Sequence, residues 1–145
     1  GQYTHAASWM VYALGRMGRG ADAHRLFDLL NPISHAENRA DADHYRVEPY
    51  VVAADVYGEG TKAGRGGWTW YTGSAGWLYR AAVEGILGIV PEGRDRLRIE
   101  PALPPDWPGF TAMITVAGRK RRVEATRDGV TLDGKGPEPD GRFAL

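Results

Sequence analysis

The chain has 145 residues, the size of one ordinary domain, and 43% of them are hydrophobic, which is enough for a core. Its 18 basic and 18 acidic residues cancel, so the composition gives no sign of a nucleic-acid or anionic-membrane partner. The chain has no cysteine, which excludes a disulfide framework and a thiolate metal site. No apolar segment approaches the ~20 residues that span a bilayer, and no secretory signal is recognisable.

Apolar residues recur at helical spacing in the first part of the chain. The period predicts helices over 6–17 and 21–30, joined by a Gly-rich turn as an αα-hairpin, and Pro32 ends the second helix. The polar stretch 33–46 has no clear period and is predicted to be a loop. No Met precedes Gly1 and a helix begins almost at once, so we expect the C-terminal piece of a longer protein.

Two further helices are predicted in the middle of the chain. The apolar run 50–57 fits a buried helix with Pro49 in its first turn, and a Gly-rich loop follows over 58–67. Ser74 is the predicted N-cap of a helix that runs to about Leu87.

After Gly88 the pattern changes to that of short strands. Strands are predicted over 97–99, 110–116, 119–126 and 130–132, with turns at Ala117–Gly118 and Asp128–Gly129 and a loose tail over 134–139. The basic run 119–122 is interpreted as a solvated sheet face. We therefore expect a mainly α fold with a small antiparallel β region, divided into residues 1–90 and 91–145, and not alternating β/α units.

The segment 66–77 carries the strongest chemical signal. Trp68, Trp70 and Tyr71 offer aromatic faces that stack on sugar rings, and they would shape the wall of a carbohydrate site. Thr72 and Gly73, just before the predicted helix, would present a hydroxyl and close backbone N–H groups to an anion. The alternative interpretation is an aromatic helix–helix core with a turn that needs glycine for its geometry.

Other polar residues allow a functional and a structural interpretation. His5, just before a helix, could bind phosphate or substrate at the positive helix end, or be a capping or solvent-facing histidine. Glu48 and Asp55 would lie on roughly one face of the predicted 50–57 helix and could hold sugar hydroxyls, or be ordinary helix-end charges. The histidines and aspartates of 35–44 match no zinc spacing, so no metal site is predicted.

Five motifs occur in an order that resembles a known family. They are YTHAASW (3–9), VEPYV (47–51), GWTWYTGSAGW (67–77), EGILG (84–88) and PPDWPGF (104–110). Together they are similar to the C-terminal part of glycoside hydrolase family 94. That family comprises cellobiose, cellodextrin and chitobiose phosphorylases, β-1,2-oligoglucan phosphorylase and the C-terminal domain of cyclic β-1,2-glucan synthase. The third motif is most similar to the glucan synthase branch.

The resemblance implies the last helical hairpins of an (α/α)6 barrel followed by a β region. It implies part of an inverting glycoside phosphorylase that converts a β-glucan and phosphate to α-glucose 1-phosphate, or the reverse. By motif, His5, Thr72 and Gly73 would bind phosphate. The family's general acid, an Asp, lies upstream of the His motif, so we expect no catalytic residue in this chain. No cofactor is implied beyond inorganic phosphate as co-substrate.

One departure from the family concerns the sugar. A sugar-binding Gln of cellobiose phosphorylases falls on Ala54, next to Asp55, which disfavours cellobiose and favours a β-1,2-glucan. The partners implied are a β-glucan oligosaccharide, phosphate and the rest of the protein's own barrel, with a homodimer left open and no nucleic acid. The implied location is cytoplasmic, and the cytoplasmic domain of a larger membrane-bound synthase is one form of it. The alternative function is a non-catalytic carbohydrate-binding or assembly remnant.

Overall fold

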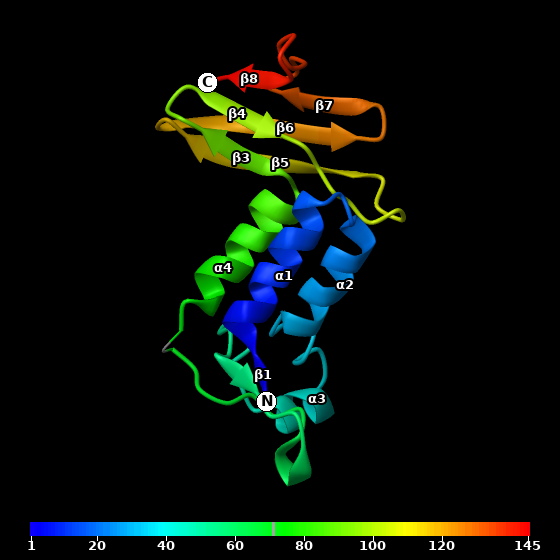
Figure 1. Cartoon of the computed structure of the whole chain (residues 1–145), viewed down its shortest axis with the longest axis vertical. Coiled ribbons are helices and arrows are strands. Elements are labelled where there is room, and N and C mark those ends of the chain that lie inside the picture. The colour runs from blue at the N-terminus through cyan, green and yellow to red at the C-terminus, as the bar shows by residue number, and fades with distance from the viewer. Residues whose placement is uncertain (71) are drawn as a thin grey trace.

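Three helical segments pack side by side in the computed structural model, which describes residues 1–70 and 72–145 (Figure 1). α1 (Thr4–Arg16) and α2 (Gly20–Leu30) form the predicted hairpin. α4 (Ser74–Arg80) packs against α1 and continues directly into the π-helical turns η2 (Ala81–Ile86). Their shared core consists of Val11, Ala23, Leu30, Leu78, Ala81 and Ile86. The helices predicted over 6–17, 21–30 and 74–87 are confirmed, with small shifts at their ends.

The closest helix crossing depends on two glycines. A Cβ atom on Gly15 of α1 would lie 2.3 Å from the backbone oxygen of Gly85 in η2, and one on Gly85 would lie 3.2 Å from the Tyr12 Cα atom. Both glycines are buried. The absence of side chains therefore lets the two backbones touch, and this contact fixes how α4 and η2 lie on α1.

The segment 33–57 differs from the prediction in two places. The expected loop contains α3 (Arg39–Tyr45), which Asn38 caps by accepting a hydrogen bond from the Asp41 N–H at 3.0 Å. The expected helix over 50–57 is wrong: this stretch is irregular and ends in the strand β2 (Asp55–Val56). Val51 and Ala53 of this stretch are buried in a small core with Tyr45 and Val47, whereas Tyr50 and Tyr57 are exposed, so non-local packing and not helical periodicity explains the apolar run.

Segment 50–57 is held in place by strand pairing. β2 pairs antiparallel with β1 (Gln2–Tyr3), at the start of α1. The Thr4 N–H donates to the Ala54 carbonyl at 2.9 Å, and the Ala54 N–H donates to the Trp68 carbonyl at 2.7 Å. The short 3-10 turn η1 (Gly60–Lys62) lies in the loop that connects β2 to Trp68. These bonds bring three distant segments of the chain together at the N-terminal end of α1.

The C-terminal part consists of two antiparallel three-stranded sheets (Figure 1). One has the order β3 (Ile89–Glu92), β4 (Arg96–Ile99), β8 (Arg142–Ala144), and the other the order β5 (Gly109–Val116), β6 (Arg119–Thr126), β7 (Gly129–Leu132). They share a core of Ile89, Leu97, Ile99, Val123, Leu132 and Phe143. The four predicted strands are confirmed, β3 and β8 were missed, and the division between residues 90 and 91 stays a prediction that falls within β3.

Turn chemistry explains the register of the second sheet. Val116 pairs with Arg119 across a two-residue loop in which Ala117 and Gly118 have φ values of 50° and 72°, as a tight hairpin turn requires. The turn predicted at Asp128–Gly129 lies one residue earlier in the structure. Thr126 pairs with Gly129, so residues 127 and 128 form that turn.

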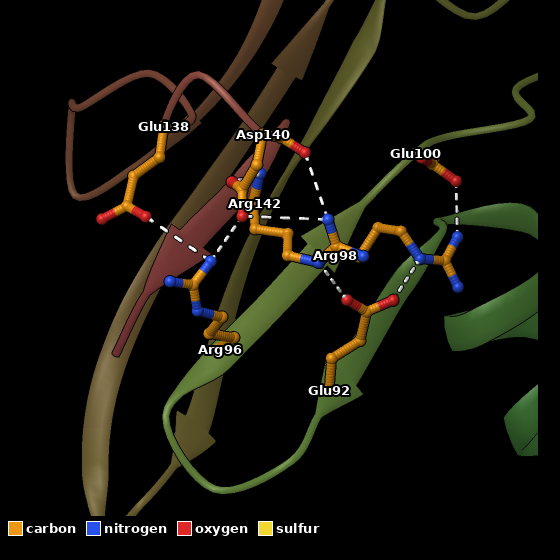
Figure 2. A network of polar contacts seen from close by, with 7 residues as sticks. All are labelled: Glu92, Arg96, Arg98, Glu100, Glu138, Asp140 and Arg142. Carbon is orange, nitrogen blue, oxygen red and sulfur yellow. Dashed lines mark hydrogen bonds and ion pairs between the residues drawn. The ribbon is translucent and has the colours of Figure 1, made fainter.

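A chain of ion pairs fastens β8 to β4 (Figure 2). Glu92 accepts hydrogen bonds from Arg98 at 2.7 Å and from Arg142 at 2.6 Å, so one carboxylate joins all three strands of this sheet. Arg96 pairs with Glu138 and Asp140 on the segment that leads into β8. These side chains are partly exposed, so the network positions the last strand more than it stabilises the whole protein.

The network predicts a pH-dependent attachment of β8. Hydrogen bonds from Arg98 and Arg142 lower the pKa of Glu92. A lowered folded pKa stabilises the folded state above the unfolded pKa of about 4.3, and this stability is lost as the pH falls through the folded value. We expect the hydrogen-exchange protection of β4 and β8 amides, corrected for intrinsic exchange, to fall over this acidic range in the wild type and much less in Glu92→Gln. Glu37→Gln, at an exposed glutamate, is the control and should follow the wild type.

Candidate functional site

A hollow of about 620 Å³ opens beside the N-terminal end of α1. It is lined by Tyr3, His5, Ala54, Trp68, Thr72 and Gly73. The lining comes from three parts of the chain: the β1–α1 junction, the residue before β2, and the segment before α4. The three residues predicted to bind phosphate therefore lie around one hollow, although 67 residues separate His5 from Thr72.

The ring of His5 lies among aromatic side chains and close to a glycine. His5 is the second residue of α1, and its ring meets Trp9 edge to face with centroids 5.1 Å apart. Trp77 lies 6.2 Å away and also packs edge to face on Trp9. A Cβ atom on Gly73 would lie 3.0 Å from His5 Cε1. Gly73 has an ordinary φ of −82°, so this close approach and not backbone conformation explains the glycine.

The hydroxyl groups beside Gly73 are arranged differently from the prediction. Ser74 is not the N-cap: it is the first helical residue and is fully buried. Thr72 Oγ1 accepts a hydrogen bond from the Ser74 N–H at 2.9 Å, and its hydroxyl also contacts Ser74 Oγ. Thr72 therefore satisfies the start of the helix and lines the hollow at the same time.

Two helices begin at this hollow. α1 and α4 lie side by side and start at the same end of the molecule (Figure 1), and the contact of His5 with Gly73 joins the two starts. A helix start carries partial positive charge and free N–H groups. The site thus combines a histidine, a hydroxyl and two helix starts, which is the chemistry that binds a small anion.

The predicted sugar-binding residues lie around this region in three different ways. Trp68 lines the hollow and is 64% exposed. Asp55 positions the backbone of Trp68: its carboxylate accepts a hydrogen bond from the Trp68 N–H at 3.2 Å and lies against Gly67. Trp70 is 72% exposed and does not line this hollow. Tyr71 lies outside the described residues.

Glu48 and Asp55 do not form a pair on one helix face, because the predicted helix is absent. Glu48 instead accepts a hydrogen bond from the Trp70 indole N–H at 3.1 Å, and Tyr50 meets the same ring edge to face. Trp70 has a φ of 64°, a conformation that costs energy for a bulky residue. The two carboxylates thus each hold one end of the 68–70 segment.

An aromatic helix–helix core was the alternative interpretation of segment 66–77, but its contact with His5 and with a salt bridge was not predicted. Tyr12 and Trp77 rings meet edge to face, Arg80 stacks 4.9 Å over Trp77, and Glu84 binds both Arg80 and Tyr12. Arg80, acting mainly through its hydrogen bond, lowers the pKa of Glu84. The four-residue spacing of His5 and Trp9 was the available signal, because it places both on one helix face.

The described residues hold no cluster of three or more His, Asp or Glu side chains suited to a metal ion. No helix among residues 1–70 and 72–145 combines the length and apolar character needed to cross a membrane.

Comparison with known proteins gives the family. Residues 1–88 match the model described as "Glycosyl hydrolase 94 superfamily, catalytic domain". The chain belongs to this superfamily. Residues 93–139 match a second model, the C-terminal domain of glycosyl hydrolase family 65. The resemblance predicted from the five motifs is thus confirmed.

Individual relatives of this family 94 chain include a synthase and several phosphorylases. The chain is 62% identical over 128 residues to a cyclic beta-(1,2)-glucan synthase of Rhizobium meliloti, covering 88% of this chain and 4% of that protein. It is 32% identical to a solabiose phosphorylase of Paenibacillus borealis, covering 92% of this chain and 18% of the relative. It is 36% identical to an N,N'-diacetylchitobiose phosphorylase of Vibrio proteolyticus, covering 74% of this chain and 13% of the relative. The chain therefore spans a small part of the length of these relatives.

Proposed function

We propose that this chain is part of an inverting glycoside phosphorylase that acts on β-glucans and that it supplies part of the phosphate site. The observation that carries the proposal is the hollow where His5, Thr72 and Gly73 meet at two helix starts. The substrate would be a β-glucan with phosphate, and the product α-glucose 1-phosphate, or the reverse. Relatives that are named phosphorylases support the reaction class.

Each residue has a separate task in this proposal. A ring nitrogen of His5 and the Thr72 hydroxyl would donate hydrogen bonds to phosphate oxygens, and the bare backbone at Gly73 would let the anion approach the N–H groups of α4. These contacts would hold phosphate in line with the anomeric carbon. Phosphate is already an anionic nucleophile, so the reaction needs one carboxylic acid to protonate the leaving oxygen and no base to activate water. We expect this acid on another part of the complete protein.

The sugar would lie on the aromatic side of the hollow. The exposed face of Trp68 is suited to stacking on a sugar ring. Asp55 would act through its hold on Trp68, and Glu48 through its hold on Trp70. Ala54 lines the hollow, and its methyl side chain cannot bind a hydroxyl, which favours a linkage other than that of cellobiose. The relative named cyclic beta-(1,2)-glucan synthase supports a β-1,2-glucan.

The proposal includes the rest of the protein. The helices α1, α2 and α4 would complete an (α/α)6 barrel with segments outside this chain, and the hollow would face the interior of that barrel. The relatives are much longer than this chain, as such an arrangement requires.

The proposed reaction is tested by incubating the complete protein with β-1,2-glucan oligosaccharides, with and without inorganic phosphate. We expect phosphate to disappear in step with the appearance of α-glucose 1-phosphate, and no reducing sugar to form without phosphate. Release of free glucose in the absence of phosphate would show hydrolysis and overturn the proposal. Tight glucan binding with no turnover in either direction would instead favour a non-catalytic binding protein.

A further inference from the structure

A second, smaller hollow lies between the C-terminal end of α3 and the hairpin of residues 57–66, which follows β2. Its volume is about 220 Å³, and it shares no lining residue with the hollow of His5. The lining consists of Asp43, His44, Arg46, Thr61, Lys62, Ala63 and Arg65. In Figure 1, α3 lies at the end of the molecule opposite the two three-stranded sheets.

The lining carries an excess of positive charge. Arg46, Lys62 and Arg65 form no ion pair with any residue among 1–70 and 72–145. The one acidic residue of the lining, Asp43, is paired with Arg39 at 2.8 Å and so does little to neutralise the three cations. The whole chain has a net charge of zero, so this local excess is a feature of the site and not of the composition.

Neighbouring groups position two of the three cations, Arg46 and Lys62. Arg46 has a left-handed φ of 57°, and its Nε donates to the Asp43 carbonyl at 3.1 Å. Lys62 Nζ lies 5.4 Å over the Tyr57 ring. Gly64, with a φ of 80°, lies against His44, where a Cβ atom would come within 2.4 Å of Nε2. The hollow is therefore built by two segments that fit each other closely.

We infer that this hollow binds a phosphate group. Its volume is below the ~300 Å³ at which pockets for drug-sized ligands begin, so it suits a small anion and not an oligosaccharide. Two guanidinium groups and one ammonium group can together supply the paired N–H donors that phosphate oxygens accept. The Thr61 hydroxyl adds a neutral donor. The phosphate group can come from inorganic phosphate or from a sugar phosphate.

A bound phosphate would also tie the hairpin to α3, because Arg46 belongs to one segment and Lys62 and Arg65 to the other. The hairpin is joined to α3 by the Gly66 N–H, which donates to the Tyr45 carbonyl at 2.9 Å. It leads directly into Gly67, whose N–H donates to the Asp55 backbone carbonyl at 2.8 Å, and then into Trp68. The phosphate group would therefore reduce the motion of the hairpin and of Gly67 and Trp68, which lead to the His5 hollow.

Equilibrium dialysis of the complete protein with radiolabelled inorganic phosphate, at constant ionic strength, tests the inference. We expect two phosphates per chain for the wild type and one for the double variant Lys62→Gln, Arg65→Gln. The matched control is Arg119→Gln, Lys120→Gln, at two exposed cations on β6, and should bind two. His5→Ala should lose the other phosphate, so failure of the proposed function and failure of this inference give different results. Competition by α-glucose 1-phosphate at the Lys62 site would identify a sugar phosphate as a second source.

A double variant that binds as much phosphate as the wild type would overturn the inference. So would a wild-type protein that binds no phosphate beyond the one lost in His5→Ala, as expected if an acidic side chain of the rest of the protein occupies the hollow. If the double variant fails to fold, amide exchange in the wild type provides a second test. In the wild type, phosphate should slow amide exchange in the 57–66 hairpin, and Arg46→Gln should reduce this slowing; unchanged exchange on adding phosphate contradicts the inference.

Discussion

Replacing His5 by alanine in the complete protein is expected to raise the KM for phosphate sharply while the affinity for glucan stays nearly unchanged. His5 lines the hollow at two helix starts, and its ring would donate a hydrogen bond to an anion. A hydrogen bond to a charged group is worth about 1.5–3 kcal/mol, which corresponds to a change in affinity of roughly 10- to 150-fold. Initial rates at varied phosphate and at varied glucan separate the two effects.

Two further variants keep this experiment informative. His24→Ala is the control, since His24 lies on α2 against Trp107, away from the hollow. His5→Asn retains a donor and should recover part of the phosphate affinity, which a purely structural role in the aromatic cluster would not explain. Phosphate kinetics that are the same in His5→Ala and in the wild type would remove His5 from the site.

Replacing Gly15 by alanine is expected to destabilise the protein, although alanine favours helices. The new Cβ atom would lie 2.3 Å from the Gly85 oxygen and 2.4 Å from the Gly85 carbonyl carbon, both backbone atoms that no side-chain rotation can move. α1 and η2 must then separate, and overpacking of this kind costs about 1–3 kcal/mol. Thermal unfolding of the complete protein measures the loss.

The matched control is Gly76→Ala in α4. Nothing lies within 4 Å of a Cβ atom at this helical glycine. Alanine should therefore stabilise the helix by up to about 1 kcal/mol relative to glycine. Opposite signs for the two substitutions would show that contact between backbones, and not helix propensity, decides the effect at Gly15. A Gly15→Ala protein as stable as the wild type would show that the crossing can relax.

Local pattern predicted those parts of the fold that are held by local interactions. The helices of the first hairpin, the helix after Gly73 and the strands of the second sheet follow from apolar spacing and turn residues. The helix predicted over 50–57 was wrong because the end of this segment pairs as a strand with β1, and Val51 and Ala53 are buried in the core around Tyr45. β8 was missed because its attachment depends on Glu92 and Arg96, far away in the sequence.

The candidate site could be assembled from the sequence only through the family motifs. Nothing in local pattern brings His5 next to Gly73, since the contact depends on how α1 and α4 pack. The pairing of Glu48 with Trp70 was likewise invisible, because it rests on a left-handed turn at a bulky residue. By contrast, Asn38 is a typical N-cap residue, and with Asp41 in the first turn it is a local signal for the start of α3.

The most direct test is an experimental structure of the complete protein with bound phosphate. The proposed function predicts a phosphate in the hollow at the starts of α1 and α4, with oxygens about 3 Å from a His5 ring nitrogen and from Thr72 Oγ1. Gly73 should face the same anion with its backbone. A protein that turns over glucan at saturating phosphate, yet holds its phosphate away from His5 and Thr72, would contradict the assignment of this chain to the phosphate site.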